Sequence, residues 1–169
     1  MQMVRNIVIL LIVLPLFVVF FMPKKELYFL LEKRLSAQNI TISGEVLQEN
    51  LLGLTVEHPT FYLGGASIAT AKEISLWSVL FYTEANFYDL QIARGLPTEL
   101  KVNVLHATHS VLSPLEVYLT SKSSLGAVEG EIRLKKRMIH LNIAKDGTIG
   151  TFAKFLKKSK KGWVYESGF

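Results

Sequence analysis

The first hydrophobic feature of the chain is an unbroken apolar run from Ile7 to Met22, flanked by Arg5 and Lys24. A helix of about 16 residues is roughly 24 Å long, and basic flanking side chains can make up the small deficit against a bilayer core. A cleaved signal peptide is the alternative, but no small-x-small cleavage pattern follows the run. We therefore expect residues 1–23 to form an uncleaved transmembrane signal anchor.

Helical spacing continues in residues 24–39, where Leu27, Leu30, Leu31 and Leu35 recur on one side. This pattern predicts a short amphipathic helix. Its leucines would either bind a membrane interface or a partner, or cover the end of the sheet that follows. The stripe alone does not separate the two interpretations. We favour the second, in which the leucines cover the end of the sheet.

From residue 40 onward the hydrophobic period changes from helical to two, which is typical of β-strands. Ile40 and Ile42 alternate with polar neighbours, and Gly64-Gly65 is a hairpin signal between two such runs. Further strands are expected at residues 73–77, 86–93, 100–106, 115–120, 127–134 and 138–144. Short strands joined by tight turns predict a mainly antiparallel, curved β-meander that occupies residues 40–169.

Alternation also assigns residues of several strands to a common face. The side chains expected to face one apolar interior are Leu54, Val56, Val117, Leu119, Ile139, Leu141 and Ile143. A second apolar feature, Trp77 to Tyr82, is hydrophobic on both strand faces. We favour ordinary core for this run, and the alternative is an exposed groove that a lipid tail or a partner could fill.

The end of the chain carries a second helical pattern and a cluster of positive charge. Ile149, Phe152, Phe155 and Leu156 share one side of a predicted short C-terminal helix, which Gly162 would end. The other side carries the four lysines of the candidate site for partner or membrane binding: Lys154, Lys157, Lys158 and Lys161. Such a face attracts anionic head groups or an acidic protein patch, although a solvated helix face has the same pattern.

Composition agrees with a membrane protein and excludes several kinds of site. Hydrophobic residues make up 50% of the chain and the mean hydropathy is +0.31, a value that soluble domains of this size rarely reach. The net charge of +5 is a mild excess, not the footprint of a nucleic-acid-binding protein. The chain has no cysteine, which excludes disulfides, thiolate metal sites and cysteine nucleophiles.

No residue pattern indicates catalysis. His106 and His109 form a close histidine pair, but they fall on opposite faces of a continuous strand and no third ligand follows at a recognisable spacing. The sequence also lacks a Gly-x-Ser-x-Gly nucleophile elbow and a phosphate-binding loop. We therefore expect no catalytic residue, no metal and no cofactor, and a protein that is not an enzyme.

Four segments together resemble the type II secretion system N protein family, which is similar in turn to the periplasmic AsmA-like proteins. They are Tyr28–Lys33, the stretch Ile40–Gly65, the hairpin Gly130–Ile143 and the ending Gly162–Glu166. The resemblance implies a single-pass inner-membrane protein with a non-catalytic periplasmic β-domain, and it gives no catalytic residue to carry over. A very short amino-terminal tail also favours a periplasmic domain, although counting the basic residues on the two sides favours the opposite orientation.

Two functions follow from these expectations. The first is a non-catalytic scaffold or assembly component of a cell-envelope machine, such as a secretion system or the periphery of a flagellar motor, which recruits partners through sheet edges. The alternative is an AsmA-like module that handles lipid or another hydrophobic ligand in an apolar concavity. The expected partners are other envelope-complex proteins, the bacterial inner membrane and lipid, with no nucleic acid.

Overall fold

A single 13-stranded antiparallel sheet organises the part of the chain that the computed structural model describes, residues 23–79, 81–92, 100–144, 153, 155–159 and 162–168. One α-helix, α2 (Lys24–Ser36), precedes the sheet, and one short 3-10 helix, η1 (Leu134–Lys136), interrupts it. The strands are β1 (Ile40–Ser43), β2 (Val46–Asn50), β3 (Gly53–Glu57), β4 (Thr60–Leu63), β5 (Ala66–Thr70), β6 (Glu73–Val79), β7 (Tyr82–Ile92), β8 (Leu100–Ser110), β9 (Ser113–Ser123), β10 (Gly126–Arg133), β11 (Met138–Ala144), β12 (Lys157–Ser159) and β13 (Gly162–Gly168). The expectation of a mainly antiparallel β fold is confirmed.

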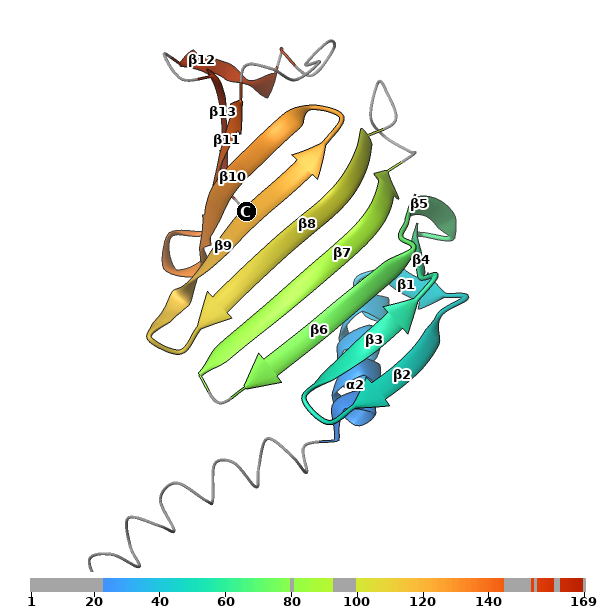
Figure 1. Cartoon of the computed structure of the whole chain (residues 1–169). Helices are drawn as coiled ribbons and strands as arrows, with labels where there is room; N and C mark the ends of the chain where they lie inside the picture. Colours follow the sequence, from blue (N-terminus) through green and yellow to red (C-terminus); the bar gives the residue numbers. More distant parts are fainter. Residues whose placement is uncertain are drawn as a thin grey trace, which may run out of the picture.

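Strand β7 joins two branches of the sheet (Figure 1). Its first part, Tyr82–Tyr88, pairs with β6, and its end, Gln91–Ile92, pairs with β5. Between these parts Asp89 has a φ of 49°, a left-handed conformation that Asp adopts more readily than β-branched residues do. Because of the resulting kink, the same side of β7 pairs both with β5, of the branch β1-β4-β5, and with β6, of the branch β2-β3-β6.

Beyond β7 the sheet continues in the order β8-β9-β10-β11-β13-β12. From β6 to β11 each strand pairs with the next along the chain, as expected of a meander. The sheet twists strongly, so that Figure 1 shows β6 to β9 face-on but β11 and β13 almost edge-on. A right-handed twist that accumulates over many strands produces this shape.

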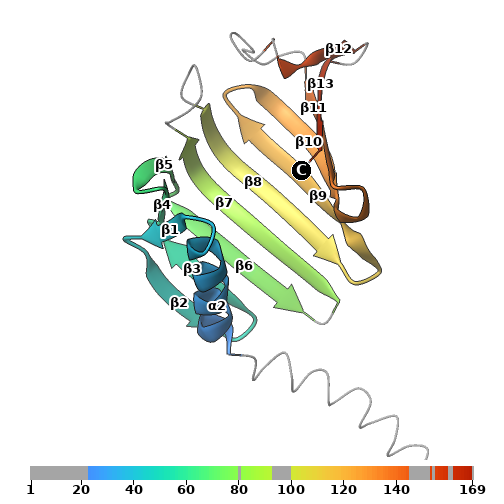
Figure 2. The ribbon, with the colours of Figure 1, turned by 180° about the vertical axis from the view of Figure 1, so that it is seen from behind.

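The hydrophobic core lies where α2 packs on one face of β1, β2 and β3 (Figure 2). Its buried side chains are Tyr28, Ile42, Leu54, Val56, Ala71 and Ile74. The Tyr28 hydroxyl donates a hydrogen bond of 3.2 Å to Glu45 Oε1. Burial, and after it the nearby Glu45 carboxylate, raises the pKa of Tyr28. The helix is thus fixed to the sheet by one aromatic ring with a satisfied hydroxyl.

The side of α2 that meets the sheet differs from the expected one. Tyr28 and Leu35 pack against the core, whereas Leu27, Leu30 and Leu31 are 45%, 56% and 50% exposed. Tyr28 and Leu35 are seven positions apart and therefore lie on one side of the helix. Of the leucine stripe only Leu35 covers the sheet, because the ring of Tyr28 occupies the place expected for the other leucines.

The expected N-terminal transmembrane helix is not part of the fold observed here. Among the described residues no helix is long and apolar enough to cross a membrane, and α2 has 13 residues with several charges. The segment from Ile7 to Met22 lies outside the described residues. The expectation of a single-pass protein of the bacterial inner membrane, with its C-terminal domain in the periplasm, is therefore not supported: the described residues contain no membrane-spanning helix.

The expected short C-terminal helix is also wrong in the part that is described. Residues Lys157–Ser159 form β12, which pairs with β13 in the register Lys157 with Val164 and Lys158 with Trp163. Ile149 and Phe152, which suggested the helix, lie outside the described residues. The helical period extended over few positions, and pairing with β13 outweighs such a weak local preference.

Candidate functional site

The strand register separates an apolar face from a polar face across the whole sheet. On one row Leu76, Ala85, Ala107, Leu119, Gly130, Leu141 and Tyr165 lie opposite one another in turn. The next row runs through Phe87, Leu105, Ser121, Val128, Ile143 and Trp163. Residues that oppose each other in an antiparallel pair point to the same side. The interior residues expected from alternation therefore do share one face.

Only part of this apolar face is covered within the described structure. The core under α2 reaches Phe87 and Leu90 in β7 and includes no residue of β8 to β13. We call the uncovered part the outer apolar face; its central members are Leu105, Leu119, Val128, Leu141, Trp163 and Tyr165. These side chains are half-buried, shielded by neighbours within a single layer of sheet. The expectation of a buried interior holds for Leu54, Val56 and Ile143, which are 3%, 2% and 5% exposed, but not for Leu119 or Leu141.

Gly130 lies in the middle of the outer apolar face. A Cβ atom at this position would lie 2.6 Å from Leu141 Cδ2 and even closer to the carbonyl oxygen of His140. Leu141 thus leans across the strand into the space that the glycine leaves. The face is therefore smooth at this point, since neither β10 nor β11 projects a second large side chain there.

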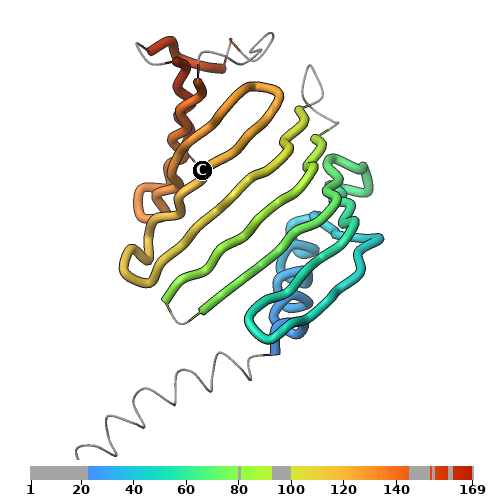
Figure 3. Tube along the Cα trace, viewed as in Figure 1, coloured from blue at the N-terminus to red at the C-terminus, as the bar shows by residue number. Residues whose placement is uncertain are grey.

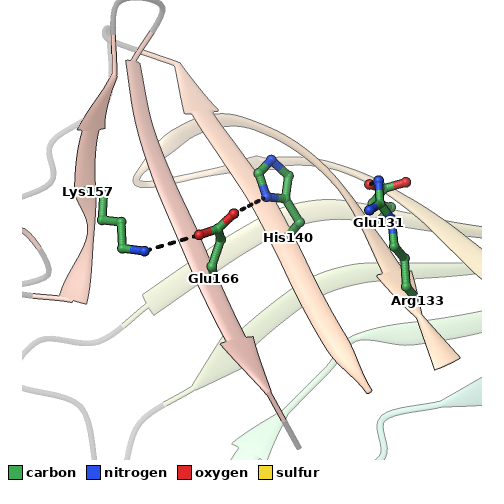
Figure 4. Close-up of polar contacts among 5 residues, drawn as sticks. All are labelled: Glu131, Arg133, His140, Lys157 and Glu166. Atoms are coloured by element: carbon green, nitrogen blue, oxygen red, sulfur yellow. Dashed lines mark hydrogen bonds and ion pairs between the residues drawn. The ribbon is translucent and has the colours of Figure 1, made fainter. Parts of the chain in front are cut away.

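The opposite face carries a charged cluster on the outer strands (Figure 4). Lys157 Nζ donates to Glu166 Oε2 at 3.1 Å, and Glu166 Oε1 lies 3.1 Å from Nδ1 of His140. Arg133 forms an ion pair with Glu131 on the same strand. Lys157, and after it His140, lowers the pKa of Glu166. The cluster pairs its charges internally, and it offers a structural link between β11, β13 and β12.

The two described lysines of the site proposed from the sequence, Lys157 and Lys158, do not share one face. Lys157 and Lys158 are consecutive in β12, so their side chains point to opposite faces of the sheet. Lys157 belongs to the charged cluster, whereas Lys158 pairs with Trp163 and lies on the side of the outer apolar face. Lys154 and Lys161 lie outside the described residues. A binding role for these lysines stays a prediction.

The two histidines of the sequence analysis lie on opposite faces, as their spacing predicted. His106 pairs with Asn86 and its Nδ1 donates to the Asn86 side-chain oxygen, with Glu84 Oε1 at 3.9 Å. His109 Nε2 donates to the carbonyl oxygen of Pro114 at 3.2 Å. Within the described residues no group of three or more His, Cys, Asp or Glu side chains could hold a metal ion.

Sequence reasoning missed two features. The contact between His140 and Glu166 depends on the pairing of β11 with β13, which alternation alone does not specify. The run from Trp77 to Tyr82 is not ordinary core, because Trp77, Phe81 and Tyr82 are 40%, 60% and 39% exposed. In the sequence, the sign of this exposure at a turn was that the run is apolar on both strand faces.

Comparison with known protein families, with curated proteins and with solved structures gives no match to this chain. The resemblance to the secretion and AsmA-like proteins therefore stays a prediction from short motifs.

Proposed function

We propose that this protein is a non-catalytic binding protein that holds the hydrocarbon chain of a lipid on the outer apolar face. The observation that carries the proposal is the continuation of the apolar rows from β8 to β13, past the strands that α2 covers. Water in contact with such a surface is unfavourable, and an apolar ligand would replace it.

The dimensions of the outer apolar face suit one acyl chain. Neighbouring strands lie about 4.8 Å apart, so the path across β8, β9, β10, β11 and β13 is about 19 Å long. One leaflet of a bilayer core is about 15 Å deep, which is the reach of a single lipid tail. A chain lying across the strands would contact Leu105, Val128 and Trp163, which are half-buried, and would pass over Ile143, which is 5% exposed.

The chemistry of the face favours a lipid over a protein segment. The backbone donors and acceptors between these strands are used in the sheet, so the face offers side chains alone. A hydrocarbon chain needs no hydrogen bond, whereas a protein segment would bring polar groups to be satisfied. Lys158 lies opposite Trp163 at the end of the row, where an anionic head group would meet a cation.

A fluorescent fatty acid titrated into the full chain tests the proposal. Leu119→Asp, in the middle of the outer apolar face, should weaken binding at least tenfold. Thr120→Asp is the matched control, because Thr120 is the next residue and lies exposed on the polar face. Lys158→Glu should weaken binding of the fatty acid but not of the uncharged alcohol of equal length. Equal affinities in all variants, or no binding by the unchanged protein, would overturn the proposal.

The scaffold function expected from the sequence remains a second candidate, and one observation favours it. Strand β2 pairs with β3 on one side, and among the described residues no strand pairs with its other side. Such an edge can accept a strand from another protein through backbone hydrogen bonds. Replacing Leu47 in β2 by Pro should then abolish capture of a protein partner while leaving fatty-acid binding intact.

A further inference from the structure

Four turns of the chain lie along one end of the sheet (Figures 1 and 3). They are the turn before β3, the turn between β6 and β7, the turn between β8 and β9, and the segment with η1 between β10 and β11. Backbone hydrogen bonds connect the first three of them: Ser78 N donates to Leu52 O at 2.9 Å, and Val111 N donates to Phe81 O at 2.8 Å. The start of α2 also lies here, because Lys24 N donates to Glu49 Oε1 at 3.2 Å.

The tips of these turns are apolar and exposed. Leu51, Phe81 and Leu112 are 63%, 60% and 89% exposed, and Val111 and Leu134 are also exposed. Turns are ordinarily built from Gly, Pro, Asn, Asp and Ser, so large aliphatic and aromatic tips need a reason. At the other end, Gly64-Gly65 forms one hairpin turn and Ser124-Leu125 another, in which Leu125 is half-buried and not exposed.

Positive charge adjoins the apolar tips. Lys135, Lys136 and Arg137 follow Leu134 directly and are all exposed. The described residues of the four turns, 51–52, 81, 111–112 and 134–137, include no acidic side chain. Trp77 and Tyr82 stand just behind the tips, with ring centroids 6.0 Å apart in an edge-to-face contact. Amphipathic aromatic rings are the side chains found at the level of lipid head groups.

We propose that this end of the sheet docks on the surface of a lipid bilayer that contains anionic lipids. The docking surface, which we call the rim, consists of Leu51, Phe81, Val111, Leu112 and Leu134 with the basic residues Lys135, Lys136 and Arg137. The five apolar side chains enter the boundary between head groups and acyl chains, as on interfacial helices. The three basic side chains bind anionic head groups, and each strengthens binding by roughly fivefold near a charged membrane.

A bilayer fits the rim better than a protein partner does. The apolar tips come from four separate turns, which lie in a row along one end of the sheet (Figure 3). A fluid apolar layer accepts such a row without shape complementarity, whereas a protein interface needs a packed centre. The charge of the rim is positive, which complements anionic head groups. The proposal goes beyond lipid holding, because the rim and the outer apolar face are separate surfaces.

Flotation of the full chain with vesicles tests the proposal. One set of vesicles is made of phosphatidylcholine alone, and the other also contains phosphatidylglycerol. We expect binding that is stronger with phosphatidylglycerol and that falls with added salt. The double variant Phe81→Ser, Leu112→Ser should lose at least tenfold in binding to both sets. The double variant Lys135→Glu, Lys136→Glu should lose at least tenfold on the anionic vesicles only.

Matched controls come from the far end of the sheet. Leu63→Ser removes a leucine that is 49% exposed, and Lys101→Glu with Lys122→Glu reverses two exposed lysines. These controls should bind vesicles as the unchanged protein does. Unchanged binding by both rim variants, equal losses in the controls, or no vesicle binding by the unchanged protein would overturn the proposal. Titration of the rim variants with the fluorescent fatty acid separates failure of bilayer docking by the rim from failure of lipid binding by the outer apolar face.

Discussion

His140 and Glu166 lie side by side across β11 and β13, with His140 Nδ1 3.1 Å from Glu166 Oε1, although 26 residues separate them in the chain. Lys157 Nζ approaches the second carboxylate oxygen at 3.1 Å. One carboxylate therefore links three strands at the edge of the sheet that lies farthest from the core under α2.

This link makes a prediction about pH. The pKa of Glu166 is lowered in the folded protein, mainly by Lys157 and then by His140. Such a carboxyl group stabilises the fold above its unfolded pKa of about 4.3, and the contribution is lost as the pH falls through the lower, folded pKa. Glu166→Gln should therefore reduce the loss of unfolding free energy between about pH 7 and about pH 3. Urea unfolding at the two pH values measures this, and an unchanged loss contradicts it.

A second prediction compares the covered and uncovered parts of the apolar face. Leu54 is 3% exposed beneath α2, so Leu54→Ala should cost about 2 to 5 kcal/mol of unfolding free energy. Leu141 is half-buried on the outer apolar face, and Leu141→Ala should cost about 1 kcal/mol. Urea unfolding of both variants gives the two values. A loss for Leu141 as large as that for Leu54 would mean that the outer apolar face is covered.

Gly130 provides a third prediction. A methyl group there would collide with Leu141 and with the backbone of His140, so Gly130→Ala should destabilise the protein by about 1 to 3 kcal/mol. Gly168→Ala is the matched control in the same sheet, because its Cβ would meet only Arg137 O at 3.6 Å. That variant should remain within about 0.5 kcal/mol of the unchanged protein. Equal melting behaviour of the two variants would show that Leu141 moves aside at no cost.

The kink of β7 provides a fourth prediction. Asp89 has a φ of 49°, which β-branched residues strongly disfavour. Asp89→Val should therefore cost about 1 to 2 kcal/mol, whereas Asp89→Asn should change the unfolding free energy little. Thermal unfolding of both variants checks the difference. If Val is tolerated as well as Asn, the left-handed conformation at this position is not required by the fold.

The two-residue period of hydrophobic positions was sufficient to predict the strands, because successive side chains of a strand point to opposite faces. Ile139, Leu141 and Ile143 alternate in β11, and both neighbouring strands extend the same two faces. The expected strand positions and the common apolar face followed from that alternation. What it could not show is which stretch of the face α2 would cover, because that depends on where the helix docks.

The predictions that were wrong failed for one reason: contacts between residues far apart in the sequence decided the structure. The helical spacing around Lys157 and Lys158 was local, but β13 pairs with these residues and makes them a strand. The leucines of α2 had the right spacing for a buried stripe, yet only Leu35 of them packs against the core, together with Tyr28, whose hydroxyl donates to Glu45. The rim was visible only as unusual apolarity from Trp77 to Tyr82, since its other members come from three further turns.

The double pairing of β7 sets the order in which a nascent chain can complete its structure. Strands β5 and β6 both pair with β7, which is synthesised after them. While residues 40–79 leave the ribosome, β5 and β6 therefore each have one edge whose backbone hydrogen bonds are not yet formed. Only when Ile92 has emerged can both edges close at once. A chain that ends before Tyr82 therefore exposes both edges, and each can pair with a strand of another chain.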